Sequence, residues 1–224
     1  MSELLPETAM PMIASAFGCD SAIAVTVAGQ ARFESYAPRA IIISGQEAGE
    51  RLFLVITGHA RMLAYALDGR MIVIDDFLAG DLFGEGTLFN APLGGDEVAA
   101  VERVEAAVLA AATMVALMGK HNAIAMAISR LLMARLGALT RRLVEGTTLS
   151  ATGRIHAELL RMARSSSNQT ITPAPVNSQL ALRVSSTRET VSRTVNALLK
   201  RGIMRREGDN LVLVSPHRLE ELVF

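Results

Sequence analysis

The sequence predicts an α+β protein in which a β-rich first half, a long helix and a small mixed module follow one another. Short strand-like runs separated by glycine turns fill residues 29–112, and the apolar period then becomes helical. The chain has 224 residues, half of them apolar, which is enough for two cores. Charge is uneven: from Ser150 onward there are 11 Lys and Arg against 6 Asp and Glu, which leaves 11 against 16 before it. A basic C-terminal half suggests a nucleic-acid surface, with ordinary surface variation as the alternative.

Several classes of protein are disfavoured by simple counts. No uninterrupted apolar run reaches the roughly 18 residues of a membrane span, and the acidic start (Glu3, Glu7) lacks the basic residues of a signal peptide. We therefore expect a cytoplasmic protein with no membrane partner. The single cysteine, Cys19, excludes an internal disulfide framework and an iron–sulfur cluster held by several thiolates.

The expected order of segments follows from these changes of pattern. The run from Ala106 to Met118 is interpreted as a buried strand that passes into a helix, and Asp68-Gly69 predicts a hairpin turn. Regularly spaced strands favour a β-roll or a sandwich. The segments are a helical start (1–28), a β-rich domain (29–112), a long helix (113–147) and a C-terminal domain (148–224).

Leucines repeat along the predicted long helix. Their 4-3-4 spacing keeps them on one helix face, and Ile128 and Leu131 extend that face. The spacing allows two interpretations: the helix packs on its own domain, or the leucines form a dimer seam like that of a coiled coil. The residues concerned are Leu132, Leu136, Leu139 and Leu143.

Two short helices around a tight turn are predicted in the C-terminal domain. They cover residues 177–184 and 188–201, and either Ser186 or Thr187 can cap the second helix, with Ser186 and Glu189 fitting a capping box. One face of the pair is apolar and is expected to pack: Leu180, Val184, Val191, Val195 and Leu198. The other face is polar at the start of the second helix, where a recognition helix meets base edges: Thr187, Arg188, Glu189, Ser192 and Arg193.

A hairpin is predicted directly after this pair of helices. Residues 205–210 connect two apolar runs, and Arg206 in this connection is placed to reach DNA phosphates. Helix-turn-helix patterns are short, so the alternative is a helical hairpin with a solvated arginine face. The added wing and the basic domain favour a winged helix-turn-helix.

With these motifs in place, the chain resembles the family of the cyclic-AMP receptor protein and FNR (the CRP/FNR family) of bacterial transcription regulators. The resemblance covers residues 30–214, and it implies a cyclic-nucleotide-binding β-roll, a dimerisation helix and a winged DNA-binding domain. The matching stretches are residues 151–155, residues 186–193, the glycines Gly45, Gly58 and Gly84, and residues 80–85 with Leu88-Phe89.

The resemblance carries expectations about DNA. Arg188, Glu189 and Arg193 match the residues that read a TGTGA-type half-site in the cyclic-AMP receptor branch. A homodimer would then read an inverted repeat in double-stranded DNA. Contact with RNA polymerase is also implied, although no residue identifies that surface.

The effector pocket departs from the family pattern. Gly84 and Glu85 match the pair that begins the phosphate cassette, but Glu97, followed by Val98, stands where the phosphate-binding arginine belongs. On the long helix, Leu139-Thr140 replaces a Thr-Ser pair that contacts adenine. A carboxylate repels a cyclic phosphate, so cyclic AMP is expected to bind weakly or not at all. Glu85 is alternatively a structural residue that accepts backbone N–H bonds.

The sequence does not identify another effector, so the cofactor is unknown. The alternative function is a signalling module that responds to another small molecule, a cyclic dinucleotide or haem, with His59 and His121 as conceivable axial ligands. Cys19 is interpreted as a small apolar filler rather than a redox sensor. We find no nucleophile–base pair, metal-ligand cluster or phosphate loop, so neither an enzyme nor a metal site is expected.

Overall fold

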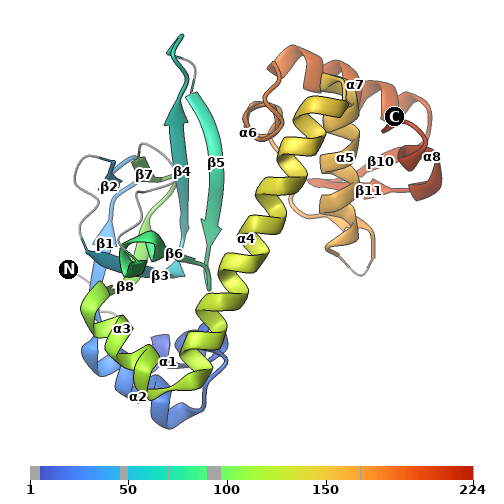
Figure 1. Ribbon diagram of the computed structural model, residues 1–224. Coiled ribbons are helices and arrows are strands. Elements are labelled where there is room, and N and C mark those ends of the chain that lie inside the picture. Colours follow the sequence, from blue (N-terminus) through green and yellow to red (C-terminus); the bar gives the residue numbers. More distant parts are fainter. Residues whose placement is uncertain (1–5, 46–49, 70, 90–96, 167, 224) are drawn as a thin grey trace. The chain divides into compact units, whose positions relative to one another are not determined.

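The computed structural model describes residues 6–45, 50–69, 71–89, 97–166 and 168–223 (Figure 1). The chain divides into two compact units, which meet between Arg135 and Leu136. The mixture of helix and sheet confirms the predicted α+β class. Helix α4, the yellow helix of Figure 1, contributes to both units.

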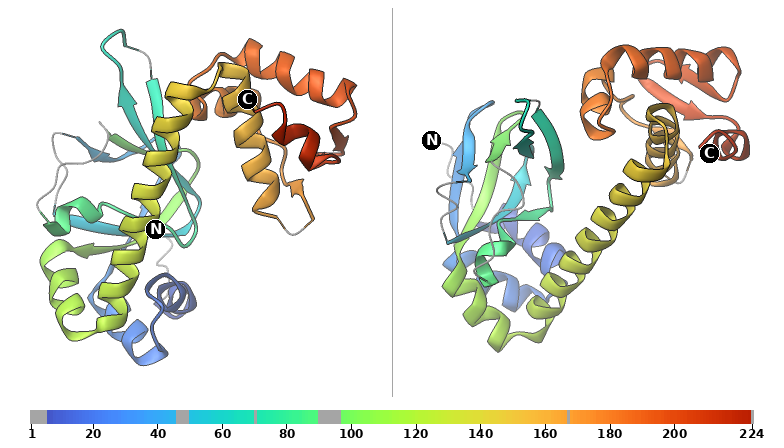
Figure 2. Two further views of the ribbon diagram at one scale, coloured as in Figure 1. Left: turned by 45° about the vertical axis from the view of Figure 1, so that its right-hand side comes forward. Right: turned by 45° about the horizontal axis from the view of Figure 1, so that its top comes forward.

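The N-terminal unit holds two four-stranded sheets with helices at one end (Figures 1 and 2). One sheet has the order β1-β8-β3-β6 and the other β2-β7-β4-β5, with antiparallel pairs in both. The elements are α1 (Pro6–Phe17), α2 (Ser21–Gln30), β1 (Arg32–Tyr36), β2 (Ile41–Ser44), β3 (Arg51–Thr57), β4 (His59–Tyr65), β5 (Met71–Leu78), β6 (Leu82–Phe83), the 3-10 helix η1 (Glu85–Phe89), β7 (Glu97–Ala100), β8 (Val104–Ala110) and α3 (Ala111–Lys120).

Strand β3 is buried on both faces and separates two cores. Leu52 and Leu54 belong to the cluster that includes the helices, whereas Phe53 and Val55 belong to the cluster between the sheets. Between the sheets the ring of Phe83 stacks on that of Phe53 with centroids 4.7 Å apart. Because side chains alternate along a strand, a strand with both faces covered has a continuous apolar sequence, as β3 has.

Two glycines of the β-roll permit close backbone approaches. A Cβ atom at Gly58 would lie 2.0 Å from the carbonyl oxygen of Arg103, and one at Gly84 would lie 2.5 Å from that of Arg51. Both glycines also have positive φ, at 91° and 85°. Any side chain there would collide with backbone, so these positions require glycine.

The predicted run from strand into helix is confirmed by β8 and α3, but the prediction of one helix over 113–147 was wrong. His121 is extended (φ −127°, ψ 100°) and ends α3, and α4 (Asn122–Thr148) begins after it. A single extended residue leaves the apolar composition unchanged, so the hydrophobic period gave no sign of the break.

Packing on its own domain, the first interpretation of the apolar face, holds for the start of α4, whereas the dimer seam stays a prediction. Ile124 and Ile128 are buried in the core of the N-terminal unit. The four leucines are exposed instead, by 37% at Leu132, 57% at Leu136, 54% at Leu139 and 69% at Leu143. By length and composition alone, α4 is also long and apolar enough to cross a membrane, with a mean hydropathy of 1.4 over its most apolar 18 residues, of which 11% are buried.

The C-terminal unit continues from α4 with a small sheet of order β10-β11-β9 and four helices. The predicted helices and hairpin are present, but the two-residue strand β9 and helix α8 were not foreseen, because elements this short carry no period. The elements are α5 (Ala151–Arg164), β9 (Thr170–Ile171), α6 (Asn177–Arg183), α7 (Arg188–Lys200), β10 (Met204–Glu207), β11 (Asn210–Leu213) and α8 (Pro216–Glu220).

The end of the chain is held against α5 by two contacts. A Cβ atom at Gly153 would lie 2.6 Å from the carbonyl oxygen of Val223, so the glycine permits a close approach. His156 is buried, and its Nδ1 lies 2.8 Å from the carbonyl oxygen of Leu222. Burial lowers the pKa of the His156 imidazole, and the positive charge of Arg201 lowers it further, while the Leu222 hydrogen bond opposes both effects.

The lowered pKa of His156 predicts acid sensitivity of the C-terminal unit. The unfolded chain takes up this proton first as the pH falls below about 6.5, so stability is present above that pH and is lost below it. In urea unfolding between pH 7.5 and 5.5, we expect H156Q to lose less stability than the wild type, whose His156 contributes at most about 1.4 kcal/mol per pH unit. H217Q removes an exposed histidine of α8 and should follow the wild type. Parallel pH curves for the wild type and H156Q would contradict the prediction.

Candidate nucleic-acid interface and effector site

The start of α7 is fixed by a tight turn after α6. Ser185 adopts a left-handed conformation (φ 49°), and the amide of Ser186 donates to the carbonyl of Ala181 over 2.9 Å. Thr187 then caps α7, since its hydroxyl accepts from the amide of Thr190 over 3.2 Å. Of the two predicted caps, the structure therefore uses Thr187, and the Ser186–Glu189 capping box is not formed.

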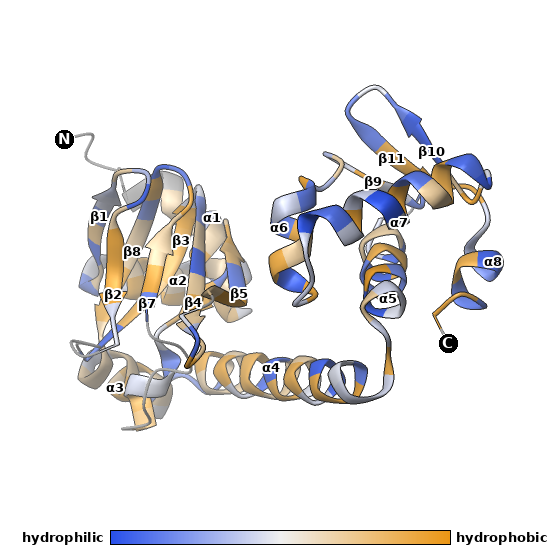
Figure 3. Cartoon of the chain, turned by 90° about the horizontal axis from the view of Figure 1, so that it is seen from above, coloured by the Kyte–Doolittle hydropathy of each residue, from blue (hydrophilic) through white to orange (hydrophobic). Residues whose placement is uncertain are grey.

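The polar face predicted for this helix lies outward. Arg188, Glu189 and Arg193 are exposed, as is the cap residue Thr187, while Ser192 is half-buried. The opposite face carries residues that are buried in the C-terminal core, as predicted: Leu180, Val184, Val191, Val195 and Leu198. The separation of the two faces leaves a hydrophilic helix start at the surface (Figure 3).

The arginines of this surface keep their charge available. Within the described residues, Arg188 and Arg206 have no ion-pair partner, and Arg193 contacts the hydroxyl of Thr190 over 3.5 Å. In the hairpin, Arg205 is instead paired with Glu207. Gly208 (φ 56°) turns the chain between β10 and β11, and Arg206, opposite Leu211, is exposed. The surface is suited to bind an anion.

A contact that the sequence did not suggest dominates the candidate effector site. Glu85 opens η1 directly after Gly84, and its carboxylate pairs with the guanidinium of Arg135 on α4. The side chains of Glu85 and Arg135 are only 14% and 19% exposed. Arg135 Nη1 donates to one oxygen of the Glu85 carboxylate, and the expectation that Glu85 also accepts backbone N–H bonds stays a prediction. Fifty residues separate the partners, so no local pattern indicates the pair.

Arg135 is held by three further contacts around Glu85. Its guanidinium donates to the carbonyl of Leu82, lies 3.8 Å from a carboxylate oxygen of Asp75, and stands 5.2 Å from the ring centre of Phe77. A cation above an aromatic face is attracted by the ring quadrupole. Arg135 therefore ties α4 to β5, β6 and η1 at the edge of the β-roll.

The other predicted effector residues have contacts of their own. The hydroxyl of Tyr65 donates to Glu97 over 2.9 Å, and Val98 is fully buried between the sheets. Leu139 and Thr140 belong to the C-terminal unit, and the Thr140 hydroxyl donates to the Leu136 carbonyl of its own helix over 2.9 Å. The cassette residues 94–96 lie outside the described residues.

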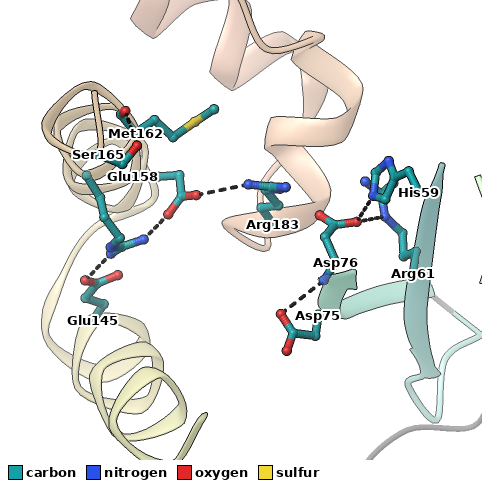
Figure 4. Close-up of polar contacts among 10 residues, drawn as sticks. His59, Arg61, Asp75, Asp76, Glu145, Glu158, Met162, Ser165 and Arg183 are labelled. Atoms are coloured by element: carbon teal, nitrogen blue, oxygen red, sulfur yellow. Dashed lines mark hydrogen bonds and ion pairs between the residues drawn. The ribbon is translucent and has the colours of Figure 1, made fainter. Parts of the chain in front are cut away.

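His59, a conceivable haem ligand, and Cys19, a conceivable redox sensor, have contacts that do not mark either function. His59 Nε2 lies 2.7 Å from Asp76, and Arg61 Nε donates to the same carboxylate oxygen over 2.6 Å (Figure 4). Burial and the negative charge of Asp20 raise the pKa of the Cys19 thiol, which opposes formation of a reactive thiolate. Among the described residues, no group of three His, Cys, Asp or Glu side chains could hold a metal ion.

The Arg135–Glu85 pair predicts a measurable coupling. R135M leaves a largely buried carboxylate unpaired and should lower the free energy of unfolding of the N-terminal unit by about 2 kcal/mol. Adding E85Q should recover part of this loss, which a double-mutant cycle in urea would measure. R130M, which removes an exposed arginine of the same helix, is the control. Additive losses in the cycle would mean that the pair is not coupled.

Comparisons with known proteins agree with this architecture. Residues 33–121 match the cyclic nucleotide-binding domain and residues 153–222 the Crp-like helix-turn-helix domain. The chain is 24% identical over 178 residues to the CRP-like cAMP-activated global transcriptional regulator of Mycobacterium tuberculosis, covering 77% of this chain and 80% of that protein.

Solved structures share the fold. A CooA mutant from Carboxydothermus hydrogenoformans superposes with a TM-score of 0.77 at 19% identity, covering 92% of this chain and 91% of that one. The c-di-GMP responsive global regulator CLP of Xanthomonas campestris gives 0.70 at 24% identity, covering 87% and 99%. With both domains matched in order along one chain, the protein belongs to the CRP/FNR family of DNA-binding transcription regulators.

Proposed function

We propose that the protein acts as a homodimer that reads an inverted repeat with TGTGA-like half-sites. The observation that carries the proposal is the exposed polar face at the start of α7, where Arg188, Glu189 and Arg193 project from a helix whose other face is buried. The N-terminal residues of a recognition helix are those that meet base edges in the major groove.

Each residue of this face suits a contact with DNA. Arginine binds the O6 and N7 atoms of guanine with two hydrogen bonds, and glutamate accepts from the amino group of cytosine. Arg188, Arg193 and Glu189 take these roles. The hydroxyls of Thr187 and Ser192 suit contacts that position the helix, and Arg206 on the wing suits a phosphate.

The dimer follows from the exposed leucines of α4. Leu132, Leu136, Leu139 and Leu143 repeat on one face at coiled-coil spacing, and a second copy of the same helix would cover them. The helix also carries Arg130, Arg135, Arg141 and Arg142. Charged side chains are costly inside a bilayer, so a protein partner suits this helix better than a membrane.

The effector is proposed to differ from cyclic AMP bound in the usual way. Glu85 is already paired with Arg135, Val98 is a core residue, and Glu97 places a carboxylate where the resemblance implies a phosphate-binding arginine. Gly84, Leu139 and Thr140 carry no positive charge, so they cannot replace the missing phosphate-binding arginine. Another small molecule, a cyclic dinucleotide or haem remains the alternative.

The localisation and partners of the protein are inferred from its family. We propose a cytoplasmic regulator that contacts double-stranded DNA and RNA polymerase, and that has no enzymatic activity. The curated relative described above is a transcriptional regulator.

The DNA proposal is tested with a labelled TGTGA-N6-TCACA duplex and a scrambled duplex at fixed salt, with and without cyclic AMP, by fluorescence anisotropy. The wild type should prefer the inverted repeat regardless of cyclic AMP. R193A should cost about 1–3 kcal/mol on this duplex and relax the preference at one guanine, whereas R206A should weaken binding to both duplexes. R218A removes an exposed arginine of α8 and is the control.

The outcomes separate the parts of the proposal. Unchanged discrimination by R193A would mean that the assigned recognition face is wrong. A preference that requires cyclic AMP would mean that the pocket binds the nucleotide without the arginine.

The dimer is tested by placing a charge among the exposed leucines of α4. L136K should shift the protein towards monomer in sedimentation velocity, because a lysine cannot be buried unpaired in a helix seam. V115K changes a similarly exposed apolar residue of α3 and should leave the assembly unchanged. A monomeric wild type, or equal behaviour of the two variants, would contradict the seam.

A further inference from the structure

Arg154 occupies a place in the C-terminal unit that the proposed DNA contacts do not explain. It lies in the first turn of α5, directly after the junction of Leu149 and Ser150 that separates α5 from α4. Ser150 caps α5 by accepting from the amide of Gly153 over 3.0 Å. The side chain of Arg154 is therefore anchored beside the end of the long helix.

The guanidinium of Arg154 donates to three backbone carbonyls from two parts of the chain. Nη1 lies 3.1 Å from the carbonyl oxygen of Leu149, at the junction. Nε lies 2.9 Å from that of Val184 and Nη2 3.1 Å from that of Ser185, both in the turn before the recognition helix. Arginine presents its donors in a rigid planar fork, so these three bonds fix the junction and the turn relative to each other.

The turn that receives these bonds benefits from support. Ser185 has a left-handed backbone conformation (φ 49°) without being glycine, and such a conformation persists only where the surroundings hold it. Val184 and Ser185 also follow the last turn of α6, where carbonyl groups lack partners within the helix. Arg154 supplies donors to both.

A second connection runs in parallel across α5. Arg161 Nη2 donates to Glu145 of α4 over 2.6 Å and also pairs with Glu158. Glu158 in turn lies 3.6 Å from Arg183 at the end of α6 (Figure 4). The side chain of Arg161 is 37% exposed, so water weakens this chain of ion pairs. The bonds of Arg154 to Leu149 and Val184 are part-buried and end on backbone carbonyls, so they form the firmer link.

We propose that Arg154 is a positioning residue that locks the α4–α5 junction to the helix-turn-helix turn, so that the last part of α4 and the recognition helix move as one rigid body. The proposal rests on the proposed DNA-reading role of α7. It agrees with the division of the chain, because residues 136–148 of α4 fall in the same compact unit as α5 to α8. A rotation of this end of α4 would then turn the reading face of α7 with it.

The test compares R154M, which removes all donors at similar length, with R154K, which keeps the charge without the fork. R164M is the matched control, because Arg164 lies on the same helix but pairs with Glu220 of α8. For each protein, the dissociation constants of the TGTGA-N6-TCACA and scrambled duplexes are measured at fixed salt. Hydrogen exchange of the free protein is followed in peptides covering residues 145–153 and 184–190.

R154M should lose at least about tenfold in affinity for the inverted repeat and change less than about twofold on the scrambled duplex. Non-specific binding depends on phosphate neutralisation, whereas base readout requires a fixed helix orientation. Exchange should become faster in both peptides together, with R154K between R154M and the wild type, and R164M like the wild type.

Three results would overturn the proposal. One is a lower melting temperature of R154M with an unchanged ratio of the two affinities, which would mean a purely structural role. Another is faster exchange in residues 184–190 alone, which would mean that Arg154 supports the turn without coupling it to the junction. The third is wild-type behaviour of R154K in both readouts, and R154K alone decides if R154M does not fold. If the wild type fails to discriminate between the duplexes, the proposed half-site fails, and the exchange measurement still decides the coupling.

Discussion

The contact between Arg135 and Glu85 determines where α4 stops being part of the β-roll domain. Before it, Ile124 and Ile128 are buried in the N-terminal core, and after it the apolar residues of the helix are exposed. A guanidinium held by a carboxylate, a carbonyl and an aromatic face has little freedom, so the contact gives the helix a fixed point of departure. Three of the four exposed leucines, Leu136, Leu139 and Leu143, and the module at the end of α4 follow this point along the chain.

The C-terminal unit combines two kinds of polar residue with opposite fates. Arg188, Arg193 and Arg206 project into solvent, where their charges remain available to a polyanion. Arg154 and His156 are turned to the backbone of their own domain and hold carbonyl groups. Composition alone counts these residues together as basic, although only the first group contributes to an anion-binding surface. The same small domain therefore holds its backbone with one group and presents free cations to solvent with the other.

Much of the fold followed from the sequence because period and turn chemistry are local. The two faces of α7, the Asp68-Gly69 hairpin and the strand-to-helix passage at Ala111 were all predictable. The break at His121 and strand β9 were missed, since one extended residue and a two-residue strand leave no periodic signal. In the effector site, Glu85 was identified but its partner Arg135 was not, because pairing across fifty residues depends on tertiary structure. The family resemblance indicated where an effector would bind, and the tertiary structure supplied the contacts of Glu85.

Gly84 has a consequence for what a family match means. Any side chain at this position would strike the carbonyl of Arg51, so the backbone tolerates no alternative to glycine whatever the domain binds. Glu97, which the resemblance places in the effector pocket, is half-buried and accepts a hydrogen bond from Tyr65 instead. The glycine therefore reports the course of the backbone and not the molecule that the domain binds. In this chain the glycine pattern identifies an inherited architecture, and the identity of the signal has to be sought in the residues around it.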